Sequence, residues 1–155
     1  MAAGTFQFLD ATAKTFMGGG DLTTATIKAA LVTSSWTPNQ DTHDEWADAS
    51  ANGITGGGTT GYTAGGYTLL SPVLTEITKG FKFSSAAPTW TAGASTLGAW
   101  RYCVFYISGT VEGMTNPIIG YFLGDSTPAD VPATTDGNTL TINCPANGWF
   151  DLTRP

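Results

Sequence analysis

The run from Ala99 to Ile107 constrains the fold of this chain more than any other feature. It reads Ala-Trp-Arg-Tyr-Cys-Val-Phe-Tyr-Ile, so that large side chains occupy both sets of alternating positions. Because successive side chains of a strand point to opposite faces of a sheet, both faces of this strand need cover. The run predicts a strand over residues 98–108 that is buried in a sandwich or contacts a partner on its second face.

Shorter runs of the same kind recur along the chain, separated by Gly, Pro and Asn. In residues 26–33, apolar Ile27 and Leu31 alternate with polar Thr26 and Lys28, which is typical of a half-buried strand. Further strands are expected at residues 67–70, 73–79, 80–84, 89–91, 118–123, 139–143 and 148–153.

This pattern of short strands fits one domain over residues 1–155, which is long enough to bury about two thirds of its unfolded surface. Disordered chains are usually highly charged and poor in aromatic residues, whereas this chain is 12% charged and has 8 Phe, 5 Trp and 5 Tyr. We therefore expect a mainly β fold, an antiparallel β-sandwich or barrel with one or two short helices.

The first 20 residues fit a short helix or an N-terminal arm. Apolar residues from Phe6 to Phe16 fall at helical spacing, and the glycines at 18–20 would end such a helix. Phe6 and Phe8 also alternate, so an N-terminal strand is the rival, and an arm ordered on a neighbouring subunit would show the same pattern. The helical spacing favours a short helix over residues 5–17.

Residues 41–48 contain the only cluster of charges. Asp41 can cap a helix of one or two turns that runs to Ala49, because acidic side chains are stabilised at a helix N-terminus. Trp46 would then pin this helix to the sheet. The Gly-rich segment 53–66 that follows is expected to be a loop.

None of the chemical motifs is complete. His43, the only histidine, lies among four acidic residues, but their spacing matches neither a calcium loop nor a zinc-binding helix. The glycines at 56–58 are not followed by Gly-Lys-Ser/Thr, and Cys103 would need a histidine base to act as a nucleophile. We expect Cys103 and Cys144 to be free thiols on strands. No catalytic residue, cofactor or metal site is predicted, and the chain is not expected to be an enzyme.

The charge balance also excludes some partners. The net charge is −6, and the six Lys and Arg residues form no cluster that could bind a phosphate backbone. No apolar run approaches the ~20 residues of a membrane span, and the start of the chain lacks the features of a signal peptide. We expect neither nucleic acid nor a membrane as a partner.

Aromatic residues are the remaining functional signal, because they are more numerous than a small core would hold. Tyr and Trp are enriched at the centres of protein interfaces, and they also stack on sugars. Most are expected in the core, whereas the two tyrosines at 62 and 67, flanked by small residues in a loop, are expected outside it. The candidate interface consists of Trp36, His43, Trp46, Tyr62 and Tyr67.

Three segments, 28–38, 41–48 and 61–66, together resemble small structural proteins of tailed bacteriophages. They read Lys-x-Ala-Leu-Val-Thr-Ser-x-Trp-Thr-Pro, Asp-Thr-His-x-x-Trp-x-Asp and Gly-Tyr-Thr-Ala-Gly-Gly. The resemblance covers the first half of the chain, and the second half shares only the general strand pattern. It implies a component of the virion, made in the host cytoplasm.

Within that class we expect a capsid decoration or cement protein on the phage capsid surface. Its partner would be the major capsid protein or another virion protein, and the chain itself would form a homo-oligomer such as a trimer. The alternative is a tail, head–tail junction or fibre protein with a glycan-binding role, in which Trp36, Tyr62 and Tyr67 would contact the sugar.

Overall fold

The computed structural model describes residues 4–9, 19–55, 62–93, 96–125, 127 and 129–153. Antiparallel sheets dominate this part of the chain and helix α2 is short, which confirms the predicted mainly β fold. The elements are β1 (Phe6–Phe8), β2 (Ile27–Val32), α2 (Ala47–Ser50), β3 (Tyr67–Thr68), β4 (Val73–Ile77), β5 (Gly80–Ser84), β6 (Thr89–Thr91), β7 (Tyr102–Ile107), β8 (Thr110–Val111), β9 (Met114–Thr115), β10 (Ile118–Leu123), β11 (Thr139–Thr141) and β12 (Phe150–Thr153).

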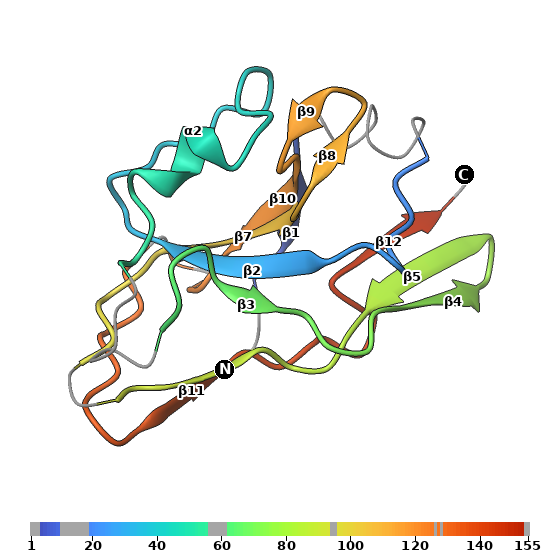
Figure 1. Ribbon diagram of the computed structural model, residues 1–155. Helices are drawn as coiled ribbons and strands as arrows, with labels where there is room; N and C mark the ends of the chain where they lie inside the picture. The colour runs from blue at the N-terminus through green and yellow to red at the C-terminus, as the bar shows by residue number, and fades with distance from the viewer. Residues whose placement is uncertain are drawn as a thin grey trace.

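A five-stranded antiparallel sheet in the order β1-β10-β7-β2-β3 runs through the centre of the molecule (Figure 1). Its central strand β7 is buried from Cys103 to Ile107, so the strand predicted from the strongest apolar run is confirmed. Strand β2 is also buried on both faces, because Ala30 and Val32 have no exposed surface. The strand was predicted correctly, but the expectation that it would be only half-buried is wrong.

The two faces of this sheet contact different parts of the chain. In Figure 1, α2 lies on one side of the sheet and β11 on the other. On the α2 side, Ala30, Val104 and Tyr106 form a small apolar cluster with Trp36. On the other side, Leu31 and its neighbours pack against side chains from the smaller sheets in a sandwich-like arrangement. These side chains are Phe83, Trp90, Leu140, Ile142, Trp149 and Phe150.

A three-stranded antiparallel sheet in the order β12-β5-β4 extends from the same core at one end of the molecule (Figure 1). It is attached through Phe83 and Phe150, which stack on each other with ring centroids 5.2 Å apart. Strand β4 is the outermost strand and is exposed along nearly its whole length. This end of the molecule is the least covered part of the described fold.

The N-terminal residues form a strand, so the predicted helix over 5–17 is wrong at Phe6–Phe8. Strand β1 pairs with β10, and the ring of Phe6 packs against Phe105 at 5.4 Å. Gly120 on β10 makes this pairing possible, because a side chain there would collide with the Phe6 ring. Thr5 and Leu9 are not helical either, and residues 10–17 of the predicted helix lie outside the described residues.

The acidic segment contains a shorter helix than predicted. Helix α2 begins after Trp46, and no side chain caps it, so Asp41 is not its cap. The Asp48 carboxylate instead accepts hydrogen bonds from the backbone N–H groups of Asp44 and Glu45, both at 3.0 Å. The helix begins late because the backbone of residues 44–46 pairs with residues 116–118. Trp46 N–H donates to the Asn116 carbonyl and Ile118 N–H donates to the Asp44 carbonyl, both at 2.9 Å.

Candidate interface

The five residues of the predicted interface lie on two different sides of the central sheet. Trp36, His43 and Trp46 belong to the α2 side, where Trp36 is buried in the smaller apolar cluster. Tyr62 and Tyr67 belong to the opposite side, where both pack against Trp90. The structure therefore does not bring the five side chains together into one surface.

The Trp36 ring stacks on His43 and donates a hydrogen bond from Nε1 to His43 Nδ1 at 3.2 Å. The same Nδ1 accepts a bond from the backbone N–H of Asn39 at 3.3 Å. With its Nδ1 lone pair facing these donors, His43 holds a turn in place. Among the described residues, no three His, Cys, Asp or Glu side chains are grouped closely enough to hold a metal ion.

Trp46 packs flat on Tyr106 of β7, with ring centroids 4.9 Å apart and an angle of 6° between the planes. The expectation that it pins its segment to the sheet is confirmed. The neighbouring Glu45 accepts a hydrogen bond from the backbone N–H of Thr115 at 2.6 Å, which ties the segment to β9 as well. The acidic segment is thus used for packing and turn formation.

Tyr62 lies inside the core, so the expectation that it lies outside is wrong. Its side chain is 3% exposed, and its hydroxyl accepts a hydrogen bond from the backbone N–H of Leu31 at 2.9 Å. Burial raises the pKa of this hydroxyl, with the bond to Leu31 acting in the opposite direction. Tyr67 is half-buried. It belongs to β3, which pairs with only two residues of β2, and the Tyr62 hydroxyl occupies the next position along that edge at Leu31.

The largest apolar side chains that are exposed gather at the other end of the molecule. Those identified among the described residues all lie on or beside the three-stranded sheet, and they are Leu70, Val73, Leu74, Phe81 and Leu152. Clustered exposed apolar side chains are typical of protein–protein contacts, whereas single ones are common on any surface. This location was missed from the sequence.

Strand register shows that three of these side chains share one face. Leu74 is opposite Phe83, and Phe83 is opposite Phe150. Two residues further along each strand, Phe81 pairs with both Glu76 and Leu152. Because directly paired residues point to the same side, this face carries apolar side chains from all three strands, with Glu76 as its one charged residue. We call its solvent-exposed part, Leu74, Phe81 and Leu152, the apolar face.

The apolar face forms one wall of a groove of about 350 Å³, and residues 20–22 line it from the other side. Deeper in the groove, Phe83 is fully buried and Phe150 is 7% exposed, so the groove opens directly onto the core. Asp21 stands at the rim. Hydrogen bonds from the Thr23 hydroxyl and backbone hold the pKa of the Asp21 carboxyl below its usual range. None of the described residues that line the groove is basic.

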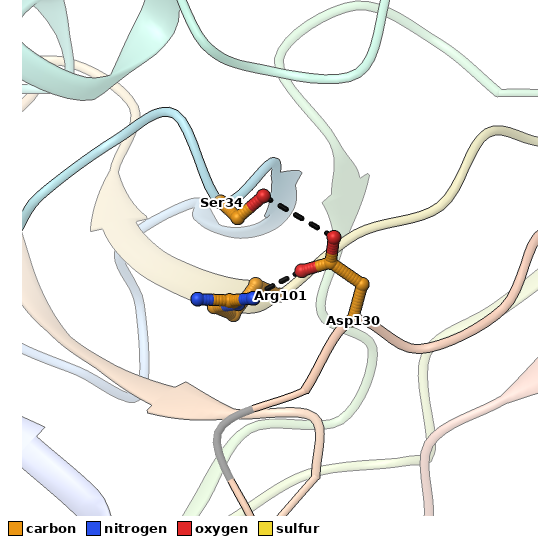
Figure 2. Close-up of polar contacts among 3 residues, drawn as sticks. All are labelled: Ser34, Arg101 and Asp130. Atoms are coloured by element: carbon orange, nitrogen blue, oxygen red, sulfur yellow. Dashed lines mark hydrogen bonds and ion pairs between the residues drawn. The ribbon is translucent and has the colours of Figure 1, made fainter.

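A separate polar cluster joins three segments near the start of β7 (Figure 2). Arg101 donates from Nε to Asp130 Oδ1 at 2.8 Å, and Ser34 donates from Oγ to Asp130 Oδ2 at 3.2 Å. Both charged side chains are partly exposed. The geometry is that of a surface ion pair that fastens the loop around residue 130 to the central sheet. The three residues are far apart in the sequence, so their contact could not be predicted from it.

Both cysteines are free, as expected, and Cys103 is fully buried. No helix among the described residues has both the length and the apolar character to cross a membrane. Comparisons with family models, with curated proteins and with solved structures found no match to this chain. Function is therefore argued from the chain's own residues.

Proposed function

We propose that this chain is a non-enzymatic structural protein of a tailed-phage particle, and that it decorates the capsid by binding across neighbouring capsid subunits. The observation that carries the binding role is the apolar face, with Phe81 53% and Leu152 50% exposed. Leaving such side chains in water forgoes burial free energy, which a neighbouring subunit would recover. The assignment to a phage particle rests on the resemblance in the first half of the chain.

A decoration role suits a rigid sandwich-like body with an apolar contact surface at one end. Each bound copy would bury this surface against the shell, and several contacts per copy or per oligomer would add avidity without new chemistry. The major capsid protein is the proposed partner. The proposed homo-oligomer would present several apolar faces to the lattice at once.

The alternative is a tail, head–tail junction or fibre protein with a glycan-binding role. Trp36 and Tyr62 are buried, so their ring faces are not open to a sugar. The half-buried Tyr102 and Tyr121 line a shallow hollow on the central sheet and provide a different aromatic surface. This hollow contains none of Trp36, Tyr62 and Tyr67, the residues proposed for sugar binding. Because two of those three are buried, the glycan-binding alternative is the weaker one.

The first test is to locate the chain in purified particles by cryo-electron microscopy. Density at regular lattice positions over the shell is the expected result. Density confined to the tail or to one vertex would replace the decoration role with the alternative.

A binding measurement with purified shells then tests the surface. The double variant Phe81→Gln with Leu152→Gln should bind at least about tenfold more weakly, because truncation of central apolar anchors has effects of this size. The matched control is Thr75→Gln with Thr153→Gln, two exposed threonines that strand register places on the opposite face of the same sheet. Equal binding by both double variants would rule out the apolar face as the contact.

A further inference from the structure

Strand β4 offers an open sheet edge beside the apolar face. It is the last strand of its sheet, and it pairs only with β5 in the described chain. No other backbone hydrogen bond between described residues involves Val73–Ile77. Proteins usually protect such an edge with charged side chains, a Pro, a bulge or a covering segment. β4 reads Val-Leu-Thr-Glu-Ile, so that Glu76 is its only charge and Pro72 directly precedes it, and its pairing with β5 has no register shift.

Exposed apolar side chains continue along this edge beyond the groove. Leu70 and Val73 are 53% and 46% exposed, and Val73 lies on the opposite face of the sheet from Leu74, which is 41% exposed. A small molecule in the groove would leave Leu70 and Val73 in water. A strand laid along β4 would instead form backbone hydrogen bonds with the edge and place alternate side chains beside the apolar face, which is a common mode of peptide recognition.

The charges identify the kind of strand that fits. Glu76 is the only charged residue of β4, and strand register places it on the groove side between Leu74 and the end of the strand. Asp21 adds a second carboxylate at the groove rim. A strand with a Lys or Arg beside Glu76 would pair opposite charges across the new ladder, which is favourable, while an acid there would be unfavourable.

A second copy of this chain fits the edge poorly. Two β4 strands that pair about a two-fold axis at Thr75 place Leu74 opposite Glu76. An axis at Glu76 places two carboxylates opposite each other, and an axis at Leu74 places Pro72 opposite Glu76. None of these arrangements supplies a cation, and each copy carries a net charge of −6.

The geometry points to the β4 edge as a binding site for an extended segment of a different protein, with apolar side chains alternating and a Lys or Arg beside Glu76. In the proposed function, this segment belongs to the neighbouring capsid subunit, and only that assignment rests on the proposed function. The site itself follows from the open edge, the apolar face and the Glu76 carboxylate, which lines a hollow with Lys79 but forms no ion pair with a described residue.

Two synthetic peptides test the site directly. Both peptides have capped ends and alternate threonine with valine. They differ only at the central residue that would face the groove, which is lysine in one peptide and glutamate in the other. Titration into the isotope-labelled full chain should shift the backbone amide signals of residues 70–77. The lysine peptide should bind about fivefold more tightly than the glutamate peptide, which is the size of a cross-strand charge effect.

Charge reversal provides the decisive variant and its control. Glu76→Lys should reverse the order of the two peptides. Asp151→Lys changes the charge equally but lies on the opposite face of the same sheet by register, so it should leave the order unchanged. No shift at residues 70–77, or no charge preference in the unaltered chain, would overturn the inference.

Other occupants of the edge give different results, each of which would also overturn it. A chain that sediments as a dimer and becomes a monomer in Glu76→Lys would show that a second copy pairs with β4. Peptide binding that appears only after Phe16→Ser and Met17→Ser would show that the chain's own segment occupies the edge.

Shell binding separates the two proposals. If shells bind the chain normally but Glu76→Lys has no effect on that binding, and the peptides do not bind, the proposed function stands and the edge inference fails. If the peptides bind as expected but shells do not bind the chain, the edge inference stands and the proposed function fails.

Discussion

The five-stranded sheet and the three-stranded sheet of this protein use similar alternating strands, yet they differ in how they are covered. The central sheet is packed on one side by the α2 segment and on the other by the smaller sheets, so that β7 has no exposed face. The three-stranded sheet is covered over Phe83 and left open over Phe81, only two residues away on the same strand and face. Within this one row of apolar side chains, burial is therefore decided by the neighbouring segments and not by residue type.

The edges of the two sheets differ in the same way. Beyond β3, the edge of β2 is completed at Leu31, whose N–H donates to Tyr62 and whose C=O accepts from the N–H of Ile54. Strand β4 has no such cover among the described residues. The first edge is covered by other parts of the chain, whereas the second is uncovered by the residues that the structure describes. The following experiments compare the two regions.

The largest expected difference is in thiol reactivity. Cys103 lies on β7 and is fully buried, and burial raises its pKa. Cys144 precedes β12 and is half-buried. Burial also raises its pKa, while a hydrogen bond with the Ser85 backbone and the nearby Lys82 act to lower it. Because the thiolate is the reactive form, and because Cys103 is reached only when the central sheet opens, we expect Cys144 to react at least about a thousandfold faster at pH 8.

Labelling with a chromogenic disulfide reagent measures both rates, with Cys144→Ser isolating Cys103. Raising the pH should accelerate the Cys144 reaction, because more of the thiol is ionised. Comparable rates for the two thiols in the native chain would show that the central sheet opens readily enough to expose Cys103.

The same truncation should have very different costs in the two sheets. Phe105→Ala on β7 removes a fully buried ring and should lower the free energy of unfolding by about 3–5 kcal/mol. Phe81→Ala removes a ring that is 53% exposed and should cost less than about 1 kcal/mol. Urea unfolding of both variants measures the difference. A loss at Phe81 as large as that at Phe105 would contradict an exposed apolar face.

A smaller effect is expected from the covered edge. Tyr62→Phe removes the hydroxyl that accepts from Leu31 and leaves a buried N–H without this partner. The expected loss is about 1–3 kcal/mol in urea unfolding. Tyr67→Phe is the matched control, since Tyr67 is half-buried and contributes its ring to Trp90. If both variants lose the same stability, the Tyr62 hydroxyl does not complete the edge of β2.

The smallest effect is expected at the surface ion pair. Arg101→Met should cost less than about 1 kcal/mol, because both partners are partly exposed and the attraction is screened by salt. Unfolding at low and high ionic strength measures it, and the difference between variant and wild type should shrink as salt is added. A loss of several kcal/mol that salt does not change would assign Arg101 a packing role instead.

Strand positions could be predicted from the sequence because alternation and turn residues are local signals. The strands around residues 27–32, 73–77, 80–84 and 118–123 were predicted for this reason. The N-terminal residues were misassigned because Phe6 and Phe8 fit both periodicities, and the decision came from pairing with β10 opposite Gly120. The helix was predicted too long because the backbone of residues 44–46 pairs with residues 116–118, a contact between segments far apart in the sequence.

The candidate interface was predicted less well than the fold. Aromatic residue type suggested Trp36 and Tyr62, but each fills a space in the core, and Tyr62 also accepts a backbone hydrogen bond. The exposed apolar face consists of ordinary strand residues such as Leu74 and Leu152. In sequence these look the same as core residues, because nothing local tells which half of an apolar row will be covered.

The sequence by itself determined that this protein is mainly β, that its strongest strand is covered on both faces, and that its cysteines are free. These properties depend on residue type and spacing along one segment. Only the tertiary structure decided which tyrosine is buried, which sheet edge is completed, and where apolar side chains remain in water. Those properties depend on contacts between segments far apart in the chain, and packing free energy is a property of such contacts.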